Sequence, residues 1–167
     1  MNSEKSSFPF LIRKIQNEDK PWIEKFVEEQ WASTTLITRR KKYHALLLDG
    51  FIAIQNDKPV GLITLCIENS DCQIITLNTI VENIGIGTEL LKTATESAQK
   101  NKCKRIWLIT TNDNTPALRF YQTRGFSLKA LYCNEIEYAR QLKPEMPLYG
   151  IDRIPIRDEI ELEYQLL

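Results

Sequence analysis

The sequence IITLNTIVENIGIGTELLKTATESAQK, residues 74–100, changes its hydrophobic period partway along. Its first part ends a run rich in β-branched residues, Gln73–Ile80, which predicts a buried strand. Within Gly87–Lys100 the apolar residues recur at helical spacing, at Leu90, Leu91, Ala94 and Ala98. A second strand-like run, Arg105–Thr111, follows, and a right-handed crossover through the helix makes the two strands parallel. The stretch therefore predicts a strand-helix-strand unit.

Antiparallel strands are predicted before this unit and further elements after it. The turn 56–59 joins two strands in a hairpin, while residues 32–43 are expected to be irregular and basic. Gly125 is expected to end a helix in a left-handed conformation. The further expected strands are Phe10–Ile15, Phe51–Gln55, Val60–Glu68, Phe126–Tyr132 and Glu159–Leu166, and the further helices are Pro21–Trp31, Thr115–Arg124 and Glu135–Leu142. The predicted fold is α/β (α+β), with a mixed, mainly antiparallel central sheet.

Length, composition and charge limit the class of protein. The 167 residues are 43% hydrophobic and 26% charged, and 22 basic residues balance 22 acidic ones. This composition is typical of one globular domain, 1–167, of which residues 1–9 are expected to be flexible. A net charge of zero disfavours nucleic acid as a partner. Because no signal-peptide core and no apolar run of about 18 residues is found, we expect a cytoplasmic protein that does not bind a membrane.

The cysteines and the histidine give no pattern of a metal site. The four cysteines lack CxxC spacing, and His44 is the only histidine. We therefore expect reduced thiols, no disulfide framework and no metal. A Ser-His-Asp or Cys-His mechanism is also disfavoured, because His44 follows a basic run without a nucleophile motif.

The turn between strand and helix, Ile84–Thr88, is a candidate phosphate-binding site. It contains Gly85 and Gly87, and the backbone N–H groups that begin a helix have no partner within that helix. These amides and the positive end of the helix dipole favour an anion such as a pyrophosphate. Glycines required by a tight turn explain the pattern equally well. The turn is not a Walker A loop, and Leu90 stands where a dinucleotide-binding motif has its third glycine.

A second motif lies on the following helix: Asn114-x-x-Ala117-x-x-x-Tyr121-x-x-x-Gly125-Phe126. Together with Gly85-x-Gly87 at a helix start, it resembles the two core motifs of the GNAT superfamily of N-acetyltransferases, over residues 74–126. The resemblance implies acetyl-CoA as the donor, and direct acetyl transfer without an acyl-enzyme to a small-molecule amine or an exposed protein amino group. It also implies a sheet that is splayed between its fourth and fifth strands and has helices on both faces.

The resemblance also implies where acetyl-CoA binds. Main-chain amides of the Gly-containing turn would hold the pyrophosphate, and the preceding strand would meet the thioester and the pantetheine. Tyr121 would act as the general acid, because a phenol of pKa about 10 is protonated at neutral pH and can donate to the departing thiolate. Arg119, Arg124 or the Lys100–Arg105 cluster would reach the 3′-phosphate, unless they form a solvated face. The candidate cofactor-binding residues are Leu77, Asn78, Thr79, Ile80, Val81, Ile84, Gly85, Ile86, Gly87, Thr88, Asn114, Ala117, Phe120 and Tyr121.

Two features depart from the family pattern. Glu82 stands where the family commonly has Gln or Arg, and its carboxylate is expected to repel a pyrophosphate. The strand before Glu82 carries no carboxylate, although an ammonium of pKa about 10 must lose a proton before it attacks. The base is expected to be Glu29, Glu68, or a water held by Thr76 or Asn78.

Two segments are candidates for the acceptor pocket. Residues 134–157 form a longer connection than a minimal family member needs, and their prolines indicate a stiff loop. We interpret this segment as an acceptor-side insertion, since such loops shape or cover sites, but a packing role without substrate contact fits equally well. The first irregular segment and the helix before it contribute the candidate substrate-binding residues Trp31, Arg39 and Tyr43.

Two other functions remain open. A non-catalytic CoA-binding sensor or interaction module would explain Glu82 and the absent strand carboxylate. A nicotinamide-dinucleotide-binding enzyme would use the two glycines after a strand, but the antiparallel first half and the missing third glycine disfavour it. The sequence identifies neither the acceptor nor the oligomeric state. A homodimer stays open, and the acidic alternation of Glu159–Leu166 is consistent with an edge strand protected by charge.

Overall fold

The computed structural model describes residues 9–167. Of the segment 1–9, which was expected to be flexible, only Pro9 falls within this range. The strands are β1 (Leu11–Lys14), β2 (Thr35–Thr38), β3 (Lys41–His44), β4 (Asp49–Gln55), β5 (Lys58–Glu68), β6 (Asp71–Thr79), β7 (Arg105–Thr111), β8 (Ser127–Tyr132) and β9 (Glu159–Gln165). The helices are α1 (Lys20–Trp31), α2 (Ile86–Lys100), α3 (Thr115–Gln122) and α4 (Glu135–Leu142). None of these four helices has both the length and the apolar character needed to span a membrane.

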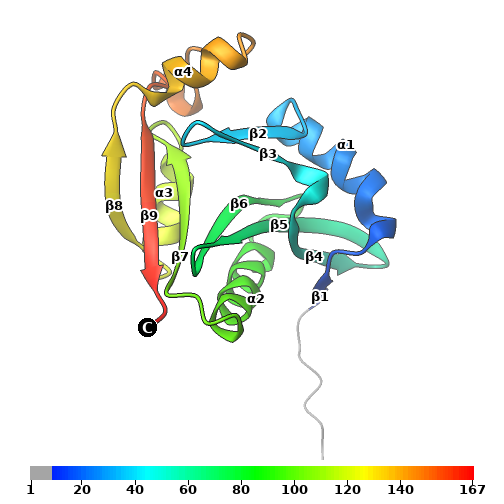
Figure 1. Ribbon diagram of the computed structural model, residues 1–167. Coiled ribbons are helices and arrows are strands. Elements are labelled where there is room, and N and C mark those ends of the chain that lie inside the picture. Colours follow the sequence, from blue (N-terminus) through cyan, green and yellow to red (C-terminus); the bar gives the residue numbers. More distant parts are fainter. Residues whose placement is uncertain (1–8) are drawn as a thin grey trace, which may run out of the picture.

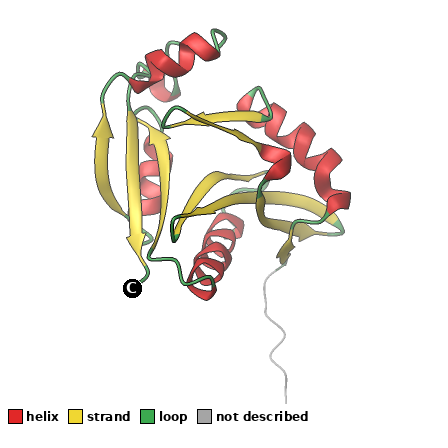
Figure 2. Ribbon diagram, viewed as in Figure 1, coloured by secondary structure: helices red, strands yellow, loops and turns green. Residues whose placement is uncertain are grey.

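Seven strands form one sheet in the order β1-β4-β5-β6-β7-β9-β8, and β2 and β3 form a separate hairpin. All neighbours in the large sheet are antiparallel except β6 and β7, which are parallel across the α2 crossover. Figures 1 and 2 show helices on both faces of this sheet. The predicted α+β fold with a mixed, mainly antiparallel sheet is therefore confirmed.

The sheet divides into two arms where its parallel strands separate. β6 and β7 are paired only from Asp71 with Arg105 to Ile74 with Leu108. Beyond these pairs β6 continues to Thr79 and β7 to Thr111 without pairing to each other. The first arm is β1-β4-β5-β6 and the second arm is β7-β9-β8. The split lies between the fourth and fifth strands predicted for the sheet, as the family resemblance implies.

Two hydrophobic clusters hold helices against opposite faces of the first arm. α2 buries Leu90, Ala94 and Ala98, whose helical spacing the sequence predicted, and these pack with sheet residues. α1 buries Phe26 and Val27 in the second cluster. Burying side chains of the size of Leu or Phe stabilises a fold by about 1.5–3 kcal/mol each. The two helices are thereby fixed, and with them the α2 N-terminus and the α1 C-terminus.

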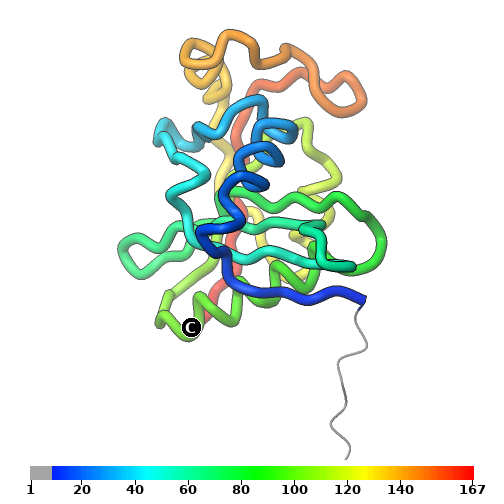
Figure 3. Tube along the Cα trace, turned by 90° about the vertical axis from the view of Figure 1, so that its right-hand side faces the viewer, coloured from blue at the N-terminus to red at the C-terminus, as the bar shows by residue number. Residues whose placement is uncertain are grey.

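The turns at the two ends of β6 lie on opposite sides of the molecule. In Figure 3 the β5–β6 turn projects to the left, and the loop from β6 into α2 projects to the right. The parallel pairing of β6 with β7 is at the β5–β6 end, because Asp71 begins β6. The two arms therefore diverge toward the β6–α2 loop, where the glycines lie.

The segment 32–43 is not irregular, and that prediction is wrong. It contains the β2–β3 hairpin, in which Leu36 pairs with Tyr43 and both side chains are buried against α1. The hairpin turn is formed by Arg39 and Arg40, with φ angles of 48° and 62°. Such turns usually contain Asn-Gly or Asp-Gly, because L-residues adopt positive φ at a cost. Two arginines gave no turn signal, so the hairpin escaped prediction.

The last strand is not an edge strand, contrary to our interpretation of its alternating glutamates. β9 lies between β7 and β8, and β8 is the edge. Glu159 and Glu161 on β9 are buried. Arg105 donates hydrogen bonds of 2.7 Å to the carboxylates of both Glu161 and Glu163. The glutamates therefore face cations supplied by other strands, which the alternation within β9 alone did not indicate.

Candidate functional site

A cavity of about 710 Å³ lies between the two arms of the sheet. This volume is typical of small-molecule and cofactor sites. The walls come from the C-terminus of α1, the separated part of β6, the β6–α2 loop, β7 and α3. The cavity therefore occupies the opening left where β6 and β7 cease to pair.

The β6–α2 turn forms one end of this cavity. Gly85, at the position before the helix, has a φ of 88°, and no side chain caps the helix. Gly85, Gly87 and Thr88 all line the cavity. A Cβ atom added to Gly87 would stand 3.5 Å from the ring of Phe120, so glycine leaves the space above the turn open. Uncapped amides and the helix dipole make this end of the cavity a site for an anion.

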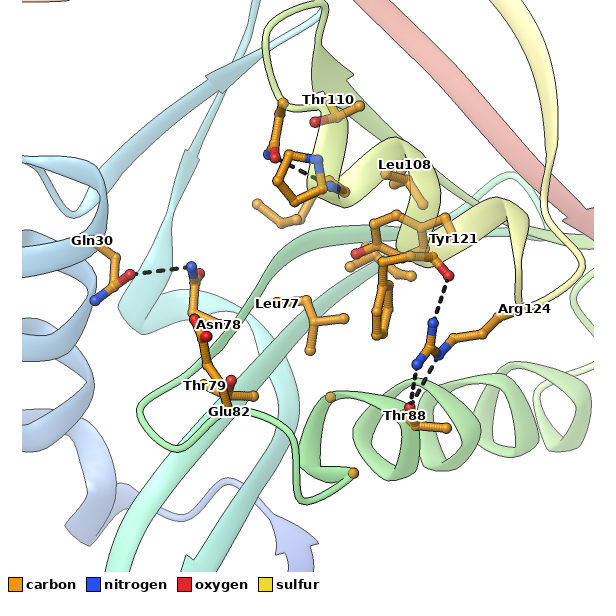
Figure 4. Close-up of a pocket in the computed structure, with 18 of the residues that line it drawn as sticks. Gln30, Leu77, Asn78, Thr79, Glu82, Thr88, Leu108, Thr110, Tyr121 and Arg124 are labelled. Carbon is orange, nitrogen blue, oxygen red and sulfur yellow. Dashed lines mark hydrogen bonds between the residues drawn. The ribbon is translucent and has the colours of Figure 1, made fainter. Parts of the chain in front are cut away.

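A cation stands at the same end of the cavity. Arg124 donates hydrogen bonds from Nε (3.0 Å) and Nη2 (2.8 Å) to Thr88 Oγ1, and its guanidinium lies 3.8 Å from the centre of the Phe120 ring. Figure 4 shows this link between α2 and the segment after α3. Among the basic residues proposed for the 3′-phosphate, Arg124 lines the cavity, whereas Arg119 does not. Arg105 is held by Asp71 and the β9 glutamates at the other end of β7.

The β7–α3 turn has a different chemistry. Asn114 precedes α3, and its side-chain oxygen accepts a hydrogen bond of 3.3 Å from the Ala117 amide. Pro116 lies in the first turn, where its missing N–H costs nothing. One of the backbone N–H groups that begin α3 is therefore already hydrogen-bonded within the chain.

Tyr121 is held on α3 with its ring in the protein core. The ring packs against Phe126 at a centroid distance of 5.3 Å, and the residue is 6% exposed. Burial raises the pKa of the Tyr121 hydroxyl above its usual value, so the group stays protonated through the neutral range. Tyr121 lines the cavity and lies across it from Leu77 and Asn78 on β6 (Figure 4).

A polar cluster lines the cavity where α1 ends. Trp31 Nε1 donates a hydrogen bond of 2.9 Å to Asn78 Oδ1, and Asn78 Nδ2 donates one of 3.4 Å to Gln30 Oε1. Thr76, the other polar candidate on β6, is 1% exposed, and its hydroxyl is 2.7 Å from that of Thr64. Asn78 is therefore open to the cavity, and Thr76 is not.

The two glutamates proposed as bases lie away from the cavity. Glu29 is on an exposed part of α1, 4.0 Å from Lys25. Glu68 ends β5 and accepts a hydrogen bond from Lys41. Among the described residues that line the cavity, the carboxylate is that of Glu82, in the β6–α2 loop.

Of the three candidate substrate-binding residues, one lines the cavity and two do not. Trp31 lines the cavity. Tyr43 is buried and donates to Gln73 Oε1 at 3.0 Å, and Arg39 contacts the second arm. Residues 134–157 are absent from the walls that line this cavity. They pack at the ends of the second arm, where Asp113 Oδ2 accepts a hydrogen bond of 3.3 Å from the Ile151 amide.

Most of the proposed cofactor-binding residues meet at the cavity. Three of them do not line it: Ile80 is exposed, Ile86 is buried in the core, and Ile84 packs against the core. Those that do line it are Leu77, Asn78, Thr79, Val81, Gly85, Gly87, Thr88, Asn114, Ala117, Phe120 and Tyr121. Wall residues that were not among the candidates include Gln30 on α1 and Leu108, Ile109 and Thr110 on β7. Ile109 and Thr110 had a signal, because the family resemblance implies that the sheet splays at this strand and they follow its last pair with β6.

Comparison with known proteins gives consistent results. The model of the Acetyltransferase (GNAT) family matches residues 11–126. The uncharacterized protein YxbD of Bacillus subtilis (strain 168) is 43% identical over 148 residues, which are 88% of this chain and 93% of that protein. A GNAT family acetyltransferase from Elizabethkingia anophelis, solved with acetyl-CoA bound, has a TM-score of 0.68 at 20% identity and covers 95% of this chain and 99% of that one.

A second solved structure agrees with the first. An acetyltransferase of Bacillus subtilis in complex with CoA has a TM-score of 0.67 at 18% identity, covering 96% of this chain and 100% of that one. At such identities the two structures show a shared fold. The family match itself runs from β1 to the end of the second motif, and so includes both turns that border the cavity. The chain therefore belongs to the acetyltransferase (GNAT) family.

Proposed function

We propose that this protein binds acetyl-CoA in the cavity between the arms and transfers the acetyl group directly to an amine. The observation that carries the proposal is a single cavity lined by an uncapped helix N-terminus at one end and by the Tyr121 side chain across from β6. The first feature suits a pyrophosphate and the second suits a thiolate leaving group.

The pyrophosphate is placed on the amides of Ile84–Thr88. Thr88 adds a hydroxyl, and Arg124, already held beside it, adds a positive charge. The pantetheine is placed along β6 beyond Ile74, where the strand has lost β7 as its partner. Its unpaired N–H and C=O groups are available to the amides of pantetheine, as on any strand edge. Two solved structures that share this fold hold acetyl-CoA and CoA, which supports the choice of ligand.

The transfer proceeds without an acyl-enzyme. The amine lone pair attacks the thioester carbonyl, a tetrahedral adduct forms, and the C–S bond then breaks. Tyr121 donates its proton to the departing sulfur, the adduct nitrogen releases its extra proton to solvent, and solvent restores the phenol. The amide product retains the acetyl group. No cysteine is among the described residues that line the cavity, which supports direct attack by the acceptor.

The acceptor amine is placed beside Trp31 and Asn78. The Trp31 side chain is partly exposed, and an indole face attracts an ammonium group. Asn78 keeps one N–H and one oxygen lone pair free after its bonds to Gln30 and Trp31. A water held there accepts the proton that the ammonium must lose. Asn78 is preferred to Thr76 because the Thr76 hydroxyl is already paired with Thr64.

The test combines binding with turnover. Calorimetry with acetyl-CoA, CoA, NAD and ATP identifies the ligand, and thiol release with a panel of primary amines measures transfer. Micromolar binding of acetyl-CoA with amine-dependent thiol release is expected. Binding without release by any amine would instead support the non-catalytic CoA-binding module, for which the Glu82 carboxylate in the cavity wall is the favouring observation.

A further inference from the structure

The β2–β3 hairpin connects the two arms of the split sheet. It begins four residues after Trp31 and crosses to the ends of β8 and β9, as Figure 1 shows. Arg40 donates two hydrogen bonds of 3.0 Å to the carboxylate of Glu135, at the start of α4. The Arg39 amide donates to Glu159 Oε1 at 3.3 Å, and its guanidinium lies 3.4 Å from the centre of the Tyr132 ring.

The base of the hairpin is attached to the first arm. Leu36 and Tyr43 are buried in the α1 cluster, and the Tyr43 hydroxyl donates to Gln73. The turn itself holds two L-residues at positive φ, a conformation that costs free energy relative to ordinary backbone. Contacts with the second arm offset this cost. The hairpin is thus attached at its base to the first arm and at its turn to the second.

Both attachment points adjoin the cavity wall. Trp31, which precedes the hairpin, lines the cavity on the first arm. On the second arm Glu159 pairs with Thr111, and the neighbouring Thr110 lines the cavity. None of the described hairpin residues lines the cavity, so the hairpin would act on a bulky acceptor beside the cavity and outside its walls.

We propose that the hairpin is a fastened strap that restricts the acceptor to slender, low-molecular-weight amines and excludes amino groups on the surface of folded proteins. This inference rests on the proposed function. The fastening residues are Arg39 and Arg40 on the hairpin, with Glu135, Glu159 and Tyr132 on the second arm. They determine specificity and take no part in the chemical step.

The experiment measures how firmly the hairpin turn is attached to the second arm, and which amine acceptors the protein uses. Hydrogen–deuterium exchange of the amides in 35–44 is compared between the wild type and Arg39→Gln/Arg40→Gln. Lys42→Gln is the matched control, because it removes a charge from an exposed position of the same hairpin. Thiol release is measured with 1,4-diaminobutane and with the surface lysines of folded lysozyme.

In the double variant we expect exchange to rise about tenfold, because the turn opens locally without global unfolding. We expect the wild type to prefer the diamine by about 100-fold, and the double variant to lose about tenfold of this preference. Lys42→Gln should match the wild type. The charge-swapped pair Arg40→Glu with Glu135→Arg should restore slow exchange.

Two results would overturn the proposal on its own. One is equal exchange in the wild type and the double variant, and the other is equal wild-type turnover of lysozyme and the diamine. A wild-type protein that binds acetyl-CoA but releases no thiol with any amine would contradict the proposed function, and the selectivity with it. The exchange result separates these cases, because it does not depend on turnover.

Discussion

Two strand-to-helix turns border the same cavity, and they differ in whether a side chain caps the helix that follows. Before α3, the Asn114 side chain accepts from the Ala117 amide, so the chain satisfies its own donor. Before α2, Gly85 stands in a left-handed conformation and no side chain caps the helix. A capping side chain contributes about 1 kcal/mol relative to alanine and a few tenths relative to glycine, so the α2 turn forgoes a small stabilisation that the α3 turn gains.

The difference indicates which turn serves a ligand. A helix N-terminus that its own chain fills contributes to the fold, whereas one left open in a cavity is available for an anion. The α3 turn in turn fixes the helix that carries Tyr121. We therefore propose that the turn before α2 binds the pyrophosphate and that α3 carries the residue for proton transfer, and substitutions can separate the two roles.

The largest expected effect is that of Tyr121→Phe on turnover. Positioned proton transfer contributes about 10²–10⁴-fold, so kcat should fall by that factor, while the phenyl ring keeps its packing against Phe126. The Kd for acetyl-CoA should hardly change, since the hydroxyl acts as charge develops on sulfur. Because burial raises the pKa of Tyr121, its deprotonation should produce no loss of kcat at neutral to mildly alkaline pH. A Phe variant with the parent kcat and a rate-limiting chemical step would make Tyr121 a packing residue.

The next largest effect is that of Gly87→Val on binding. A branched side chain above the open turn should block the pyrophosphate and weaken acetyl-CoA binding by about 100-fold, the loss of several charge-assisted hydrogen bonds. Calorimetry measures the Kd, and thermal unfolding checks the fold. Gly87 is a cleaner choice than Gly85, whose φ of 88° would strain any side chain.

Thr93→Val, which places the same side chain on α2 but outside the cavity wall, is the control for the Gly87 variant. It should bind acetyl-CoA like the parent. Unchanged affinity in Gly87→Val would remove the pyrophosphate from this turn.

Asn114 is among the candidate cofactor-binding residues, but its side chain already caps α3, so we expect its loss to change stability and not affinity. Asn114→Ala removes the acceptor of the Ala117 amide and should lower the free energy of unfolding by about 1 kcal/mol, as measured by urea titration. Asn114→Asp, which keeps a capping oxygen, should restore most of this loss. A weakening of acetyl-CoA binding in Asn114→Ala far beyond the loss of stability would show that both turns serve the ligand.

The smallest expected effect is that of Glu82→Gln. Glu82 lines the cavity beside the open turn, and two charges 4 Å apart in water interact by about 1 kcal/mol. Removing the negative charge should tighten acetyl-CoA binding by a few-fold, an effect that salt diminishes. Glu96→Gln, on an exposed part of α2, should have no such effect. A large loss of affinity in Glu82→Gln would mean that the carboxylate assists binding.

The backbone features of the site were predictable, because glycines and an Asn-Thr-Pro helix start determine local conformation. Arg105–Thr111 and Glu135–Leu142 have the bounds that periodicity predicted. The pairing of polar side chains was not predictable, because the two partners of each pair lie in different segments of the chain. The pairs are Thr64 with Thr76 and Trp31 with Asn78. The sequence offers Glu29 and Glu68 as bases, but it does not show that both side chains lie away from the cavity.

The two wrong predictions share a physical cause. Arg39 and Arg40 form a turn that their own conformational preferences disfavour, and the glutamates of β9 are buried against their ordinary preference for water. In both cases a residue from another segment compensates: Glu135 for Arg40, and Arg105 for Glu161. The local sequence pattern describes one residue of such a pair. The order of the strands in the folded sheet determines which residue is its partner.

The position of β9 has a consequence for synthesis of the chain. The first arm has all its strands once residue 79 has been made, but β7 has four pairs with β6 against seven with β9. The second arm therefore waits for residues 159–165, which follow at about 5–20 residues per second, a delay of roughly 4–16 s. Through that interval a nascent chain carries one wall of the cavity without the other, and α3, which packs on the second arm, has no finished surface to fold against.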